Sequence, residues 1–488
     1  MYIRLGGYEM RVLFVASEAS PFIKSGGLGD VAGALPKALA QKNADVRVVI
    51  PKYKELNWEV KDKLRFVKWF NVHVGWREEF CGVWECFYNG VTYYVLDNER
   101  YFNRDGLYGF YDDAERFAFF DRAVLDMLRQ IDWQPDLIHC NDWQTGMLPV
   151  LLKFQYKKYD SFYWNMKCVY SIHNIAFQGV YDPNILPELF GFDLELYENT
   201  CLKFDDGVSF MKGGLYYSDI ITTVSNSYAG EIQTQEYGHR LDGVLRDRSY
   251  ALRGIVNGID YDEFNPKTDK RIVKNYDVNS FRSKVVNKLA LQKELGLTVD
   301  ENVPMIAMVT RLTAQKGLDL LVNISDRLLQ ENVQLVILGT GERHYEDHFK
   351  WLDYAYGNKV SANIKFDNTL ANKIYASSDM FLMPSAFEPC GLGQLIALRY
   401  GSIPIVRETG GLRDTVNPYN EYTGEGNGFS FKNYNAEELL NIIKYALWIY
   451  KDKKKWNTLI TNAMNSNNSW ERSAQIYLDM YRELTGQY

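Results

Sequence analysis

Residues 380–415 are the feature that most limits the fold, and they read MFLMPSAFEPCGLGQLIALRYGSIPIVRETGGLRDT. Two short apolar runs, 380–383 and 403–406, are typical of buried strands in a parallel sheet. Between them lie a turn with one acid, Glu388, then Gly391 and Gly393, and a helix at 394–400. Strand, glycine-bearing turn, helix and strand form half of a nucleotide-binding unit, and the N–H groups that open such a helix bind phosphate oxygens. The pattern predicts that this turn binds a phosphate group beside an acid, and we call the turn the phosphate seat. The alternative is that the glycines serve only the packing of an ordinary strand–helix turn.

Length and composition limit the class of protein. A chain of 488 residues is too long for one core, so two or three domains are expected. No apolar run reaches membrane-spanning length, and residues 1–9 lack the apolar segment of a signal peptide. The 55 basic and 62 acidic residues give a net charge of −7, which argues against nucleic acid as a partner and suits a neutral polymer. The six cysteines form no CxxC pair, so we expect reduced thiols in a cytoplasmic protein.

Strands and helices alternate along most of the chain. Antiparallel hairpins are predicted at 69–96, where Asn89-Gly90 is a strong turn signal. A C-terminal helix is predicted at 471–484, with Ile476, Tyr477, Met480 and Tyr481 on one face. The other predicted strands are 11–16, 46–50, 137–140, 168–172, 220–224, 305–309, 333–338, 364–366, 380–383 and 403–406, and further helices are predicted at 30–41 and 114–130.

Six sequence blocks, taken together and in this order, resemble the bacterial glycogen synthase and plant starch synthase family. The resemblance runs from about Met10 to near the C-terminus. The blocks are Lys24-Ser25-Gly26-Gly27-Leu28-Gly29-Asp30, Asn141-Asp142-Trp143, Ser171-Ile172-His173-Asn174, Gly254-Ile255-Val256-Asn257-Gly258, Arg311 with Lys316-Gly317, and Glu388-Pro389-Cys390-Gly391-Leu392 with Thr409-Gly410-Gly411-Leu412.

The resemblance implies the α/β GT-B fold, in which two Rossmann-like doubly wound domains face each other across a cleft. We expect a flexible extension at 1–9, an N-terminal, acceptor-side domain at 10–258 and a turn-rich crossover at 259–275. A C-terminal nucleotide-sugar domain would follow at 276–468, and residues 469–488 would form a helix that returns to the first domain.

The N-terminal glycines formally fit a dinucleotide pattern, Gly27-x-Gly29-x-x-Ala32. The fit fails because the first glycine lies more than ten residues beyond the preceding strand and the second strand ends without an acid. A nicotinamide enzyme is therefore rejected, and a flexible loop that carries Lys24 to a diphosphate or sugar is expected. A surface turn with a solvated lysine is the alternative.

The resemblance also implies roles for individual residues. Lys24, Gly26, Gly27 and Tyr108 resemble the donor site of the first domain. Asp142, His173 and Asn257 resemble residues that hold the transferring glucose, with the histidine donating a hydrogen bond to a sugar hydroxyl and the aspartate accepting one. Arg311 and Lys316 resemble a diphosphate clamp, although a charged helix cap would look the same in sequence. Glu388 resembles the catalytic-site acid, and Cys390, Gly391, Leu392 and Gly393 resemble the phosphate seat.

Four positions depart from the family's pattern. Phe366 stands where bacterial enzymes often stack a tyrosine on adenine, and Gln144 replaces a frequent histidine. Ser25 and Gly393 stand where threonine is common. A stack on the nucleobase survives with phenylalanine, and glycine does no harm at 393 if that position acts through its backbone.

The expected reaction is transfer of glucose from a nucleotide-glucose, ADP-glucose by resemblance, to the non-reducing 4-hydroxyl end of an α-1,4-glucan such as glycogen or a maltooligosaccharide, with retention. A non-catalytic glucan-binding protein on the same fold is the runner-up, and a hydrolase that pairs Asp142 with Glu388 is a further alternative. The hydrolase is disfavoured because it needs no diphosphate clamp.

No metal or other cofactor is expected. Asp260-Tyr261-Asp262 follows Asn257-Gly258, where aspartates commonly serve turns, so a turn is favoured over a metal site. Lys24, Arg311 and Lys316 supply three cations, and a helix start adds about half a charge, against a leaving group of roughly two to three negative charges. The oligomeric state is not predicted.

Overall fold

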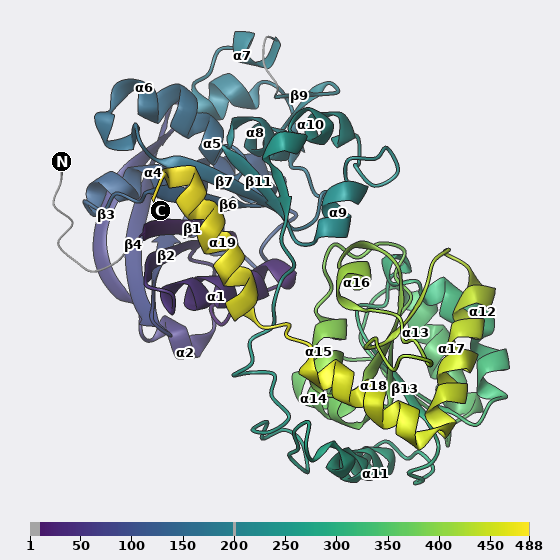
Figure 1. Cartoon of the computed structure of the whole chain (residues 1–488). Helices are drawn as coiled ribbons and strands as arrows, with labels where there is room; N and C mark the ends of the chain where they lie inside the picture. The colour runs from purple at the N-terminus through teal and green to yellow at the C-terminus, as the bar shows by residue number, and fades with distance from the viewer. Residues whose placement is uncertain (1–9, 199–201, 488) are drawn as a thin grey trace. The chain divides into compact units, whose positions relative to one another are not determined.

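The computed structural model describes residues 10–198 and 202–487 and divides the chain into two compact units (Figure 1). The first unit comprises Met1–Ile255 and Trp470–Tyr488, and the second comprises Val256–Ser469. The predicted end of the first domain, at residue 258, lies just beyond this boundary, and the predicted crossover at 259–275 belongs to the second unit. The predicted extension at 1–9 lies outside the described residues. Within the described ranges, no helix combines the length and the apolar character needed to cross a membrane.

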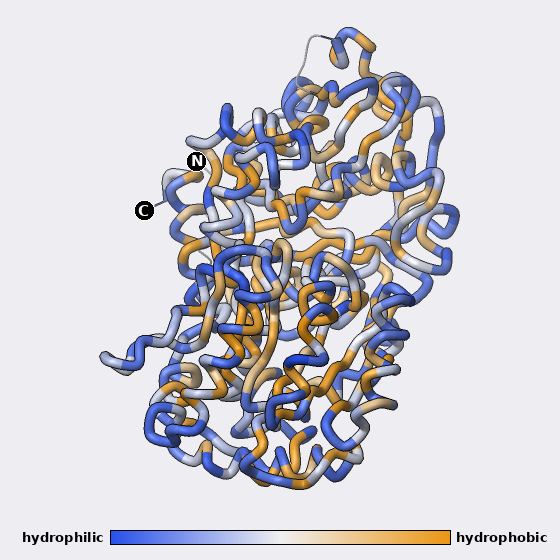
Figure 2. The backbone as a smooth tube through the Cα atoms, turned by 90° about the vertical axis from the view of Figure 1, so that its right-hand side faces the viewer, coloured by the Kyte–Doolittle hydropathy of each residue, from blue (hydrophilic) through white to orange (hydrophobic). Residues whose placement is uncertain are grey.

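A nine-stranded sheet forms the centre of the first unit. Its spatial order is β12-β11-β7-β6-β1-β2-β5-β4-β3, and the strands from β12 to β5 are parallel. Burial on both faces explains the nearly continuous apolar runs of the inner strands. Figure 2 shows that hydrophobic segments run mainly through the interior and that hydrophilic segments are frequent in the outer turns. The strands are β1 (Met10–Val15), β2 (Ala44–Pro51), β3 (Arg65–Val74), β4 (Arg77–Tyr88), β5 (Val91–Asp97), β6 (Leu137–Asn141), β7 (Lys167–Ile172), β11 (Ile220–Thr223) and β12 (Leu252–Gly254).

The predicted hairpins are confirmed. β3, β4 and β5 pair antiparallel, and β5 then joins β2 in parallel. Asn89 and Gly90 connect β4 to β5 with φ values of 49° and 83°. Two left-handed residues are what a tight hairpin turn requires, since they match the twist of the flanking strands. A small second sheet contains β8 (Val180–Tyr181), β9 (Lys203–Phe204) and β10 (Gly207–Ser209).

Helices pack on both faces of the first sheet. The predicted helix at 30–41 is confirmed as α1, but its predicted start was wrong, because α1 begins at Gly27 and both Gly27 and Gly29 are helical rather than part of a loop. The helices are α1 (Gly27–Ala40), α2 (Trp58–Lys61), α3 (Glu99–Phe102), α4 (Asp113–Gln130), α5 (Leu148–Leu151), α6 (Lys157–Tyr159), α7 (Glu195–Glu198), α8 (Phe210–Tyr217), α9 (Asn226–Glu231), α10 (Asp242–Asp247) and α19 (Trp470–Thr485), with shorter turns η1 (Trp143–Thr145), η2 (Leu152–Tyr156), η3 (Ser161–Tyr163), η4 (Leu186–Phe190) and η5 (Ser249–Ala251).

The C-terminal helix α19 lies against α1 in the first unit (Figure 1). Tyr481 is fully buried, and its hydroxyl is 2.6 Å from Nδ1 of His139 on β6. Ile476 is 46% exposed, so its predicted place on the buried face was wrong. It lies one residue before Tyr477 and is therefore turned away from the centre of that face.

The second unit contains a six-stranded, fully parallel sheet in the order β15-β14-β13-β16-β17-β18. Numbered by position in this unit, the order is 3-2-1-4-5-6, the doubly wound order of dinucleotide-binding folds. The predicted α/β class with two doubly wound units is confirmed. The strands are β13 (Met305–Val309), β14 (Gln334–Leu338), β15 (Val360–Asn363), β16 (Met380–Met383), β17 (Ile403–Arg407) and β18 (Phe429–Phe431).

The predicted strand at 364–366 was wrong. The strand is β15, and Phe366 lies beyond its end with 80% of its surface exposed. Ile364 and Phe366 alternate as strand residues do, but pairing with β14 stops at Asn363. The helices of this unit are α11 (Lys284–Glu294), α12 (Leu318–Leu329), α13 (Arg343–Ala355), α14 (Asn368–Ser377), α15 (Gly393–Arg399), α16 (Gly410–Thr415), α17 (Ala436–Lys451) and α18 (Lys453–Asn465), with turns η6 (Phe281–Ser283) and η7 (Ala314–Lys316).

Candidate active site

The strand order of the second unit identifies where a ligand is expected. Its order reverses between β13 and β16, and ligands of open α/β sheets bind at the carboxyl ends of the strands on either side of such a point. Arg311 and Lys316 follow β13, and Glu388 follows β16. Topology therefore brings the predicted clamp and the predicted acid to one edge of this sheet.

Lys316 and Glu388 form a nearly buried ion pair. The Lys316 Nζ atom is 2.6 Å from Glu388 Oε2, and the two side chains are 14% and 8% exposed. The hydroxyl of Ser385 donates a second hydrogen bond to the same oxygen at 3.1 Å. Glu388 is therefore held in one orientation by an ammonium and a hydroxyl, and its other oxygen is left for further contacts.

The turns after β13 and β16 bind each other through the backbone. The N–H of Ala386 donates to the carbonyl of Gln315 at 2.9 Å, and Gln315 Nε2 donates to the carbonyl of Phe387 at 3.3 Å. Gly317 has φ 69°, and a Cβ there would lie 2.0 Å from the carbonyl oxygen of Pro384. The Lys-Gly pair in the sequence thus has a steric cause, because a side chain at 317 would separate the two turns.

The predicted phosphate seat lies at the start of α15. Gly391 has φ 75°, and no acceptor for the N–H groups of Gly391 or Leu392 is found among residues 10–198 and 202–487. A Cβ on Gly393 would lie 3.1 Å from the ring of Phe381, so glycine suits this position. Two adjacent N–H groups without acceptors are suited to an anionic oxygen.

The Thr409-Gly410-Gly411 motif supports this turn from behind. The N–H of Gly411 donates to the carbonyl of Glu388 at 3.1 Å, and a Cβ on Gly410 would lie 2.0 Å from that same carbonyl oxygen. The two sequence motifs occur together because one packs its backbone directly on the other.

Four further predicted residues of the second unit differ in their surroundings. Asn257 is 7% exposed, and its buried Oδ1 atom has no hydrogen-bond partner within the described part of the chain. Cys390 is buried, and desolvation raises the pKa of its thiol to about 12, partly offset by the backbone N–H of Asn257. Arg311 and Phe366 are exposed. The Oδ1 atom of Asn257 and the exposed side chains of Arg311 and Phe366 are therefore available to contact a ligand.

The first unit has its own reversal point, between β1 and β6. Glu18, just after β1, is 3% exposed and accepts the backbone N–H of Ser25 at 2.5 Å. Its burial raises the pKa of this carboxyl, and N–H groups from Ser25 and Gly29 oppose that rise. Glu18 therefore sits at the start of α1 and fixes the segment that carries Lys24.

Lys24 does not extend freely into solvent. Its Nζ atom is 2.8 Å from Asp30 Oδ1, with side-chain exposures of 42% and 35%. Gly26 precedes α1, and Gly27 is its first residue. The segment predicted as a flexible loop is therefore a helix start whose lysine is paired with an acid one turn into the helix.

Asp142 adopts a backbone conformation that favours glycine. Its φ is 56° and its ψ is −177°, a combination that costs about 1–3 kcal/mol and is concentrated at functional sites. Its Oδ1 atom accepts the backbone N–H of His173 at 2.7 Å. Burial raises the pKa of Asp142 to about 7, against the lowering effect of the N–H groups of His173 and Asn174.

Asn141 fixes the tautomer of His173. The Asn141 Nδ2 atom donates to the carbonyls of Val15 and His139, so Oδ1 is the atom 2.8 Å from His173 Nε2 and must accept. Burial lowers the pKa of His173 to about 4, so the ring is neutral with its proton on Nε2. Nδ1 is then an acceptor, which differs from the donor role expected from the sequence.

Tyr108 lies beside the same sheet edge. Its hydroxyl is 2.8 Å from the Ser17 hydroxyl, which directly follows β1. Gln144, in the turn after Asp142, has a buried Oε1 atom without a hydrogen-bond partner among the described residues. Both side chains therefore belong to the polar surroundings of this edge.

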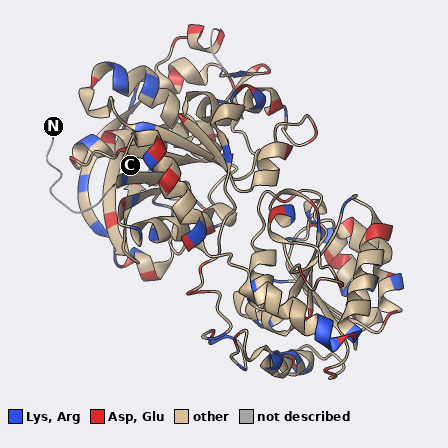
Figure 3. Cartoon of the chain, in the orientation of Figure 1, with Lys and Arg blue, Asp and Glu red and all other residues tan. Residues whose placement is uncertain are grey.

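The charges of the candidate residues are more balanced than the sequence alone indicates. Lys24 is paired with Asp30, and Lys316 is paired with Glu388, whereas Arg311 has no carboxylate partner among the described residues. Over each unit, acidic and basic residues are interspersed (Figure 3). The earlier sum of three cations omitted these two carboxylates.

The aspartates at 260 and 262 adopt turn geometry. Asp260 Oδ1 accepts the backbone N–H of Asp262 at 2.9 Å. Within residues 10–198 and 202–487, no three His, Cys, Asp or Glu side chains are grouped closely enough to hold a metal ion.

No role was predicted for three residues in these surroundings: Glu18, Asn141 and Ser385. Glu18 and Asn141 each lie at the carboxyl end of a parallel strand, which is the signal that could have identified them. Ser385 gives no such signal, because serine after a strand is common in ordinary turns.

Two family models and several curated proteins match this chain. The family model for the starch synthase catalytic domain matches residues 11–247, and the model for glycosyl transferases group 1 matches residues 293–465. The chain is 85% identical to a curated glycogen synthase from Clostridium beijerinckii, over 98% of this chain and 100% of the relative. It is 63% identical to a glycogen synthase from Clostridium perfringens, over 98% and 99% of the two chains.

A solved structure is similar over the whole chain. The catalytic domain of starch synthase IV from Arabidopsis thaliana, bound to ADP and acarbose, matches with a TM-score of 0.91 and 33% identity. The match covers 98% of this chain and 99% of the plant chain.

Proposed function

Because the chain belongs to the glycogen synthase and starch synthase family, we propose that it transfers glucose from ADP-glucose to the non-reducing 4-hydroxyl end of an α-1,4-glucan, with retention of configuration. The enzyme is a retaining glycosyltransferase of the GT-B class. The observation that carries the proposal is the 85% identity with a curated glycogen synthase over its full length. A protein that only binds glucan would not need an acid held by a lysine beside free N–H groups at a sheet reversal point.

ADP is the proposed nucleotide of the donor. The similar plant enzyme was solved with ADP bound. Phe366 is exposed in the second unit, where its ring is available to stack on a nucleobase rather than to fill the core. Stacking of this kind is worth about 1–3 kcal/mol per base in nucleic-acid sites.

In the second unit, we assign the leaving diphosphate to Arg311, Lys316 and the N–H groups of Gly391, Leu392 and Gly393, with Cys390 lying behind them. Retention then follows from attack on the face that the diphosphate leaves, so the protein's main task is to stabilise the charge that develops on that group. Glu388 contacts the donor glucose, and Lys316 holds its carboxylate in place. Asn257 supplies a buried acceptor for a sugar hydroxyl.

In the first unit, Asp142 and His173 are assigned to the transferring glucose. Both present acceptors, since Nδ1 of His173 is unprotonated while Asn141 binds Nε2. Sugar hydroxyls can donate to both. Lys24, Gly26, Gly27 and Tyr108 are assigned to the donor, with the start of α1 offering N–H groups and Lys24 a cation.

No divalent metal is assigned to the reaction, because Arg311 has no carboxylate partner among the described residues and the N–H groups of Gly391 and Leu392 have no acceptor there, so these groups can bind the diphosphate. We also propose a cytoplasmic location. The Sγ atoms of Cys140 and Cys168 lie 3.9 Å apart as free thiols, which suits a reducing compartment.

The test is a donor-specificity assay with the purified protein and glycogen. ADP-glucose should give much faster incorporation of glucose than UDP-glucose. Binding of glycogen without incorporation from either donor would support the non-catalytic alternative. Release of free glucose from glycogen would indicate a hydrolase.

A further inference from the structure

A fully buried glutamine lies inside the phosphate seat. Gln394 is the second residue of α15, and it is 0% exposed. Burying an amide is costly unless its polar atoms are hydrogen-bonded, so a core position would favour an apolar side chain. The hydrogen-bond partners of Gln394 therefore indicate what this side chain does.

The amide nitrogen of Gln394 binds two consecutive backbone carbonyls of the seat. Nε2 donates to the carbonyls of Cys390 and Gly391, both at 2.9 Å. The Oγ1 atom of Thr415 is the third neighbour, at 3.2 Å. The Thr415 hydroxyl donates to the carbonyl of Gly411 at 2.6 Å, so its oxygen accepts from Gln394. Because all three neighbours are acceptors, the nitrogen end of the amide faces them.

Binding these carbonyls also sets the direction of two N–H groups. The carbonyl of Cys390 shares a peptide plane with the N–H of Gly391, and the carbonyl of Gly391 shares the next plane with the N–H of Leu392. In a trans peptide, the C=O and N–H bonds point in opposite directions. The two carbonyls point at the buried amide, so the two N–H groups point away from it. These are the N–H groups for which no acceptor is found in residues 10–198 and 202–487.

The oxygen end of the amide lies against Gly391. Oε1 of Gln394 is buried and has no hydrogen-bond partner among the described residues. A Cβ on Gly391 would lie 2.5 Å from this oxygen and 3.1 Å from Cγ of Glu388. Glycine at 391 therefore lets the turn close over the amide, in addition to allowing its positive φ.

Loss of the donor would allow the two peptide groups to turn. A buried carbonyl without its hydrogen bond carries the full cost of its removal from water. Rotation of either peptide plane toward another donor would relieve that cost and would turn the N–H group with it. Donors that stabilise a leaving group are most effective when their direction is fixed before the reaction. The amide thus contributes preorganisation and no direct contact with the ligand.

We propose that Gln394 is a positioning residue of the phosphate seat, whose amide holds the N–H groups of Gly391 and Leu392 in the direction in which they bind the leaving diphosphate. The proposal rests on the proposed function, because that function supplies the diphosphate. The effect of Gln394 on the reaction passes through these two peptide groups.

The experiment removes the donor in two ways. Gln394→Met has nearly the same length and no hydrogen-bonding group, whereas Gln394→Glu stays polar and loses the donor when it is ionised. Both variants are made in the full chain, and binding is measured well below the Tm of each. Calorimetric titration gives the affinity for ADP and for adenosine, which has the same base and ribose without the phosphates. Initial rates give kcat and the KM for ADP-glucose.

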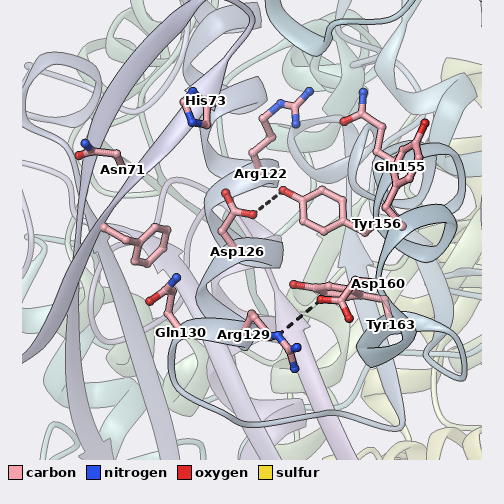
Figure 4. A pocket seen from close by; sticks show the side chains of 12 residues that line it. Asn71, His73, Arg122, Asp126, Arg129, Gln130, Gln155, Tyr156, Asp160 and Tyr163 are labelled. Atoms are coloured by element: carbon pink, nitrogen blue, oxygen red, sulfur yellow. Dashed lines mark hydrogen bonds and ion pairs between the residues drawn. The ribbon is translucent and has the colours of Figure 1, made fainter.

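Two other glutamines provide matched controls. Gln292 on α11 is also 0% exposed, and its Nε2 atom donates to the carbonyl of Asp300 and to Oε1 of Gln334, both at 2.8 Å. Gln155 in the first unit donates to the carbonyl of Phe190 at 2.7 Å and lines a cavity of 460 Å³, shown in Figure 4. Gln292→Met and Gln155→Met therefore remove the same kind of hydrogen bond outside the seat.

Both Gln394 variants should bind ADP about tenfold more weakly than wild type and adenosine with unchanged affinity. Their kcat should fall about 100-fold, the lower end of the effect of losing one oxyanion donor, because the charge on the diphosphate is largest in the transition state. The two control variants should keep the ADP affinity and the kcat of wild type, even where their Tm falls.

Wild-type affinity for ADP in both Gln394 variants would overturn the proposal. An equal loss of adenosine affinity, or an equal loss of ADP affinity in Gln292→Met, would also overturn it, since either result would indicate a general distortion of the unit. ADP binding needs no transfer, so these affinities test the role of Gln394 even if wild type transfers no glucose. That last result would contradict the proposed function instead.

Discussion

Replacing Lys316 by Met should both destabilise the second unit and abolish glucose transfer. The change leaves Glu388 as a nearly buried carboxylate without its cation, since the two side chains are 14% and 8% exposed. Breaking one partner of a buried pair costs about 3–5 kcal/mol. A domain of about 150–250 residues loses about 2–4 °C in Tm per kcal/mol, so a fall of roughly 10 °C is expected.

The double variant Lys316→Met/Glu388→Gln, compared with the two single variants, measures the interaction between the two side chains. It leaves no unpaired charge, so its loss of stability should be smaller than the sum of the single losses by about 1–3 kcal/mol. Transfer should stay low in all three proteins, because each lacks a group placed at the diphosphate or glucose, and one lost clamp group costs about 100- to 1,000-fold. Thermal unfolding and initial rates with ADP-glucose and glycogen supply both measurements.

A matched control exists in the same unit. Lys288 and Asp379 form a similar pair, with Nζ 2.7 Å from Oδ2 and side-chain exposures of 3% and 14%. Lys288→Met should lower Tm by a comparable amount while the folded enzyme keeps its kcat. Additive losses in the double variant would refute the coupled pair. Equal loss of kcat in Lys288→Met and Lys316→Met would refute the assignment of Lys316 to the diphosphate.

Three further predictions concern Phe366, Asp142 and the requirement for a metal ion. Phe366→Ala should raise the KM for ADP-glucose about tenfold by loss of stacking, with no change in Tm. The control Tyr354→Ala, which also removes an exposed ring, should leave this KM unchanged. An unaltered KM in Phe366→Ala would exclude the stack. Because burial raises the pKa of Asp142 from 3.8 to about 7, the folded state binds extra protons in that range and loses stability as pH rises through it. Asp142→Asn should therefore have a higher Tm than wild type at pH 8 and an equal Tm near pH 4, whereas a pH-independent difference would contradict the shift. Excess EDTA should leave the rate unchanged, and loss of activity restored by magnesium would make Asp260 and Asp262 candidate ligands.

The strand pattern was predictable because buried parallel strands leave a strong signal. The runs at 380–383 and 403–406 are apolar without interruption, and both are strands of the central sheet. Candidate site residues at strand ends, such as Asp142 and His173, could be proposed from the sequence for the same reason. Topology then brings strand ends together regardless of their distance in sequence.

The start of α1 was not predictable from periodicity. Gly27 and Gly29 have low helix propensity, so the sequence shows a loop there. In the structure, the buried carboxylate of Glu18 accepts N–H groups at this helix start. The contact between the Glu18 carboxylate and backbone N–H groups stabilises the early start of α1, and helix propensities do not include contacts of this kind.

The ion pairs of the site were also hidden from sequence. Lys316 and Glu388 are separated by 72 positions, and only the packing of two turns brings them together. Lys24 and Asp30 are six residues apart, but their pairing depends on helix α1, whose predicted start lay after its observed start at Gly27. Charge counted along a chain therefore overstated the cations available to a phosphate.

Retaining transfer from ADP-glucose to an α-1,4-glucan is the activity proposed for this chain, and the linkage formed in the first product distinguishes it from the alternatives. Wild-type protein, ADP-glucose labelled with ¹³C at C1 and maltotriose are followed by proton NMR from the first turnovers. We expect a new labelled α-anomeric signal of a 1,4-linked residue that appears with ADP. A labelled β-linkage, or labelled free glucose without chain extension, would contradict it.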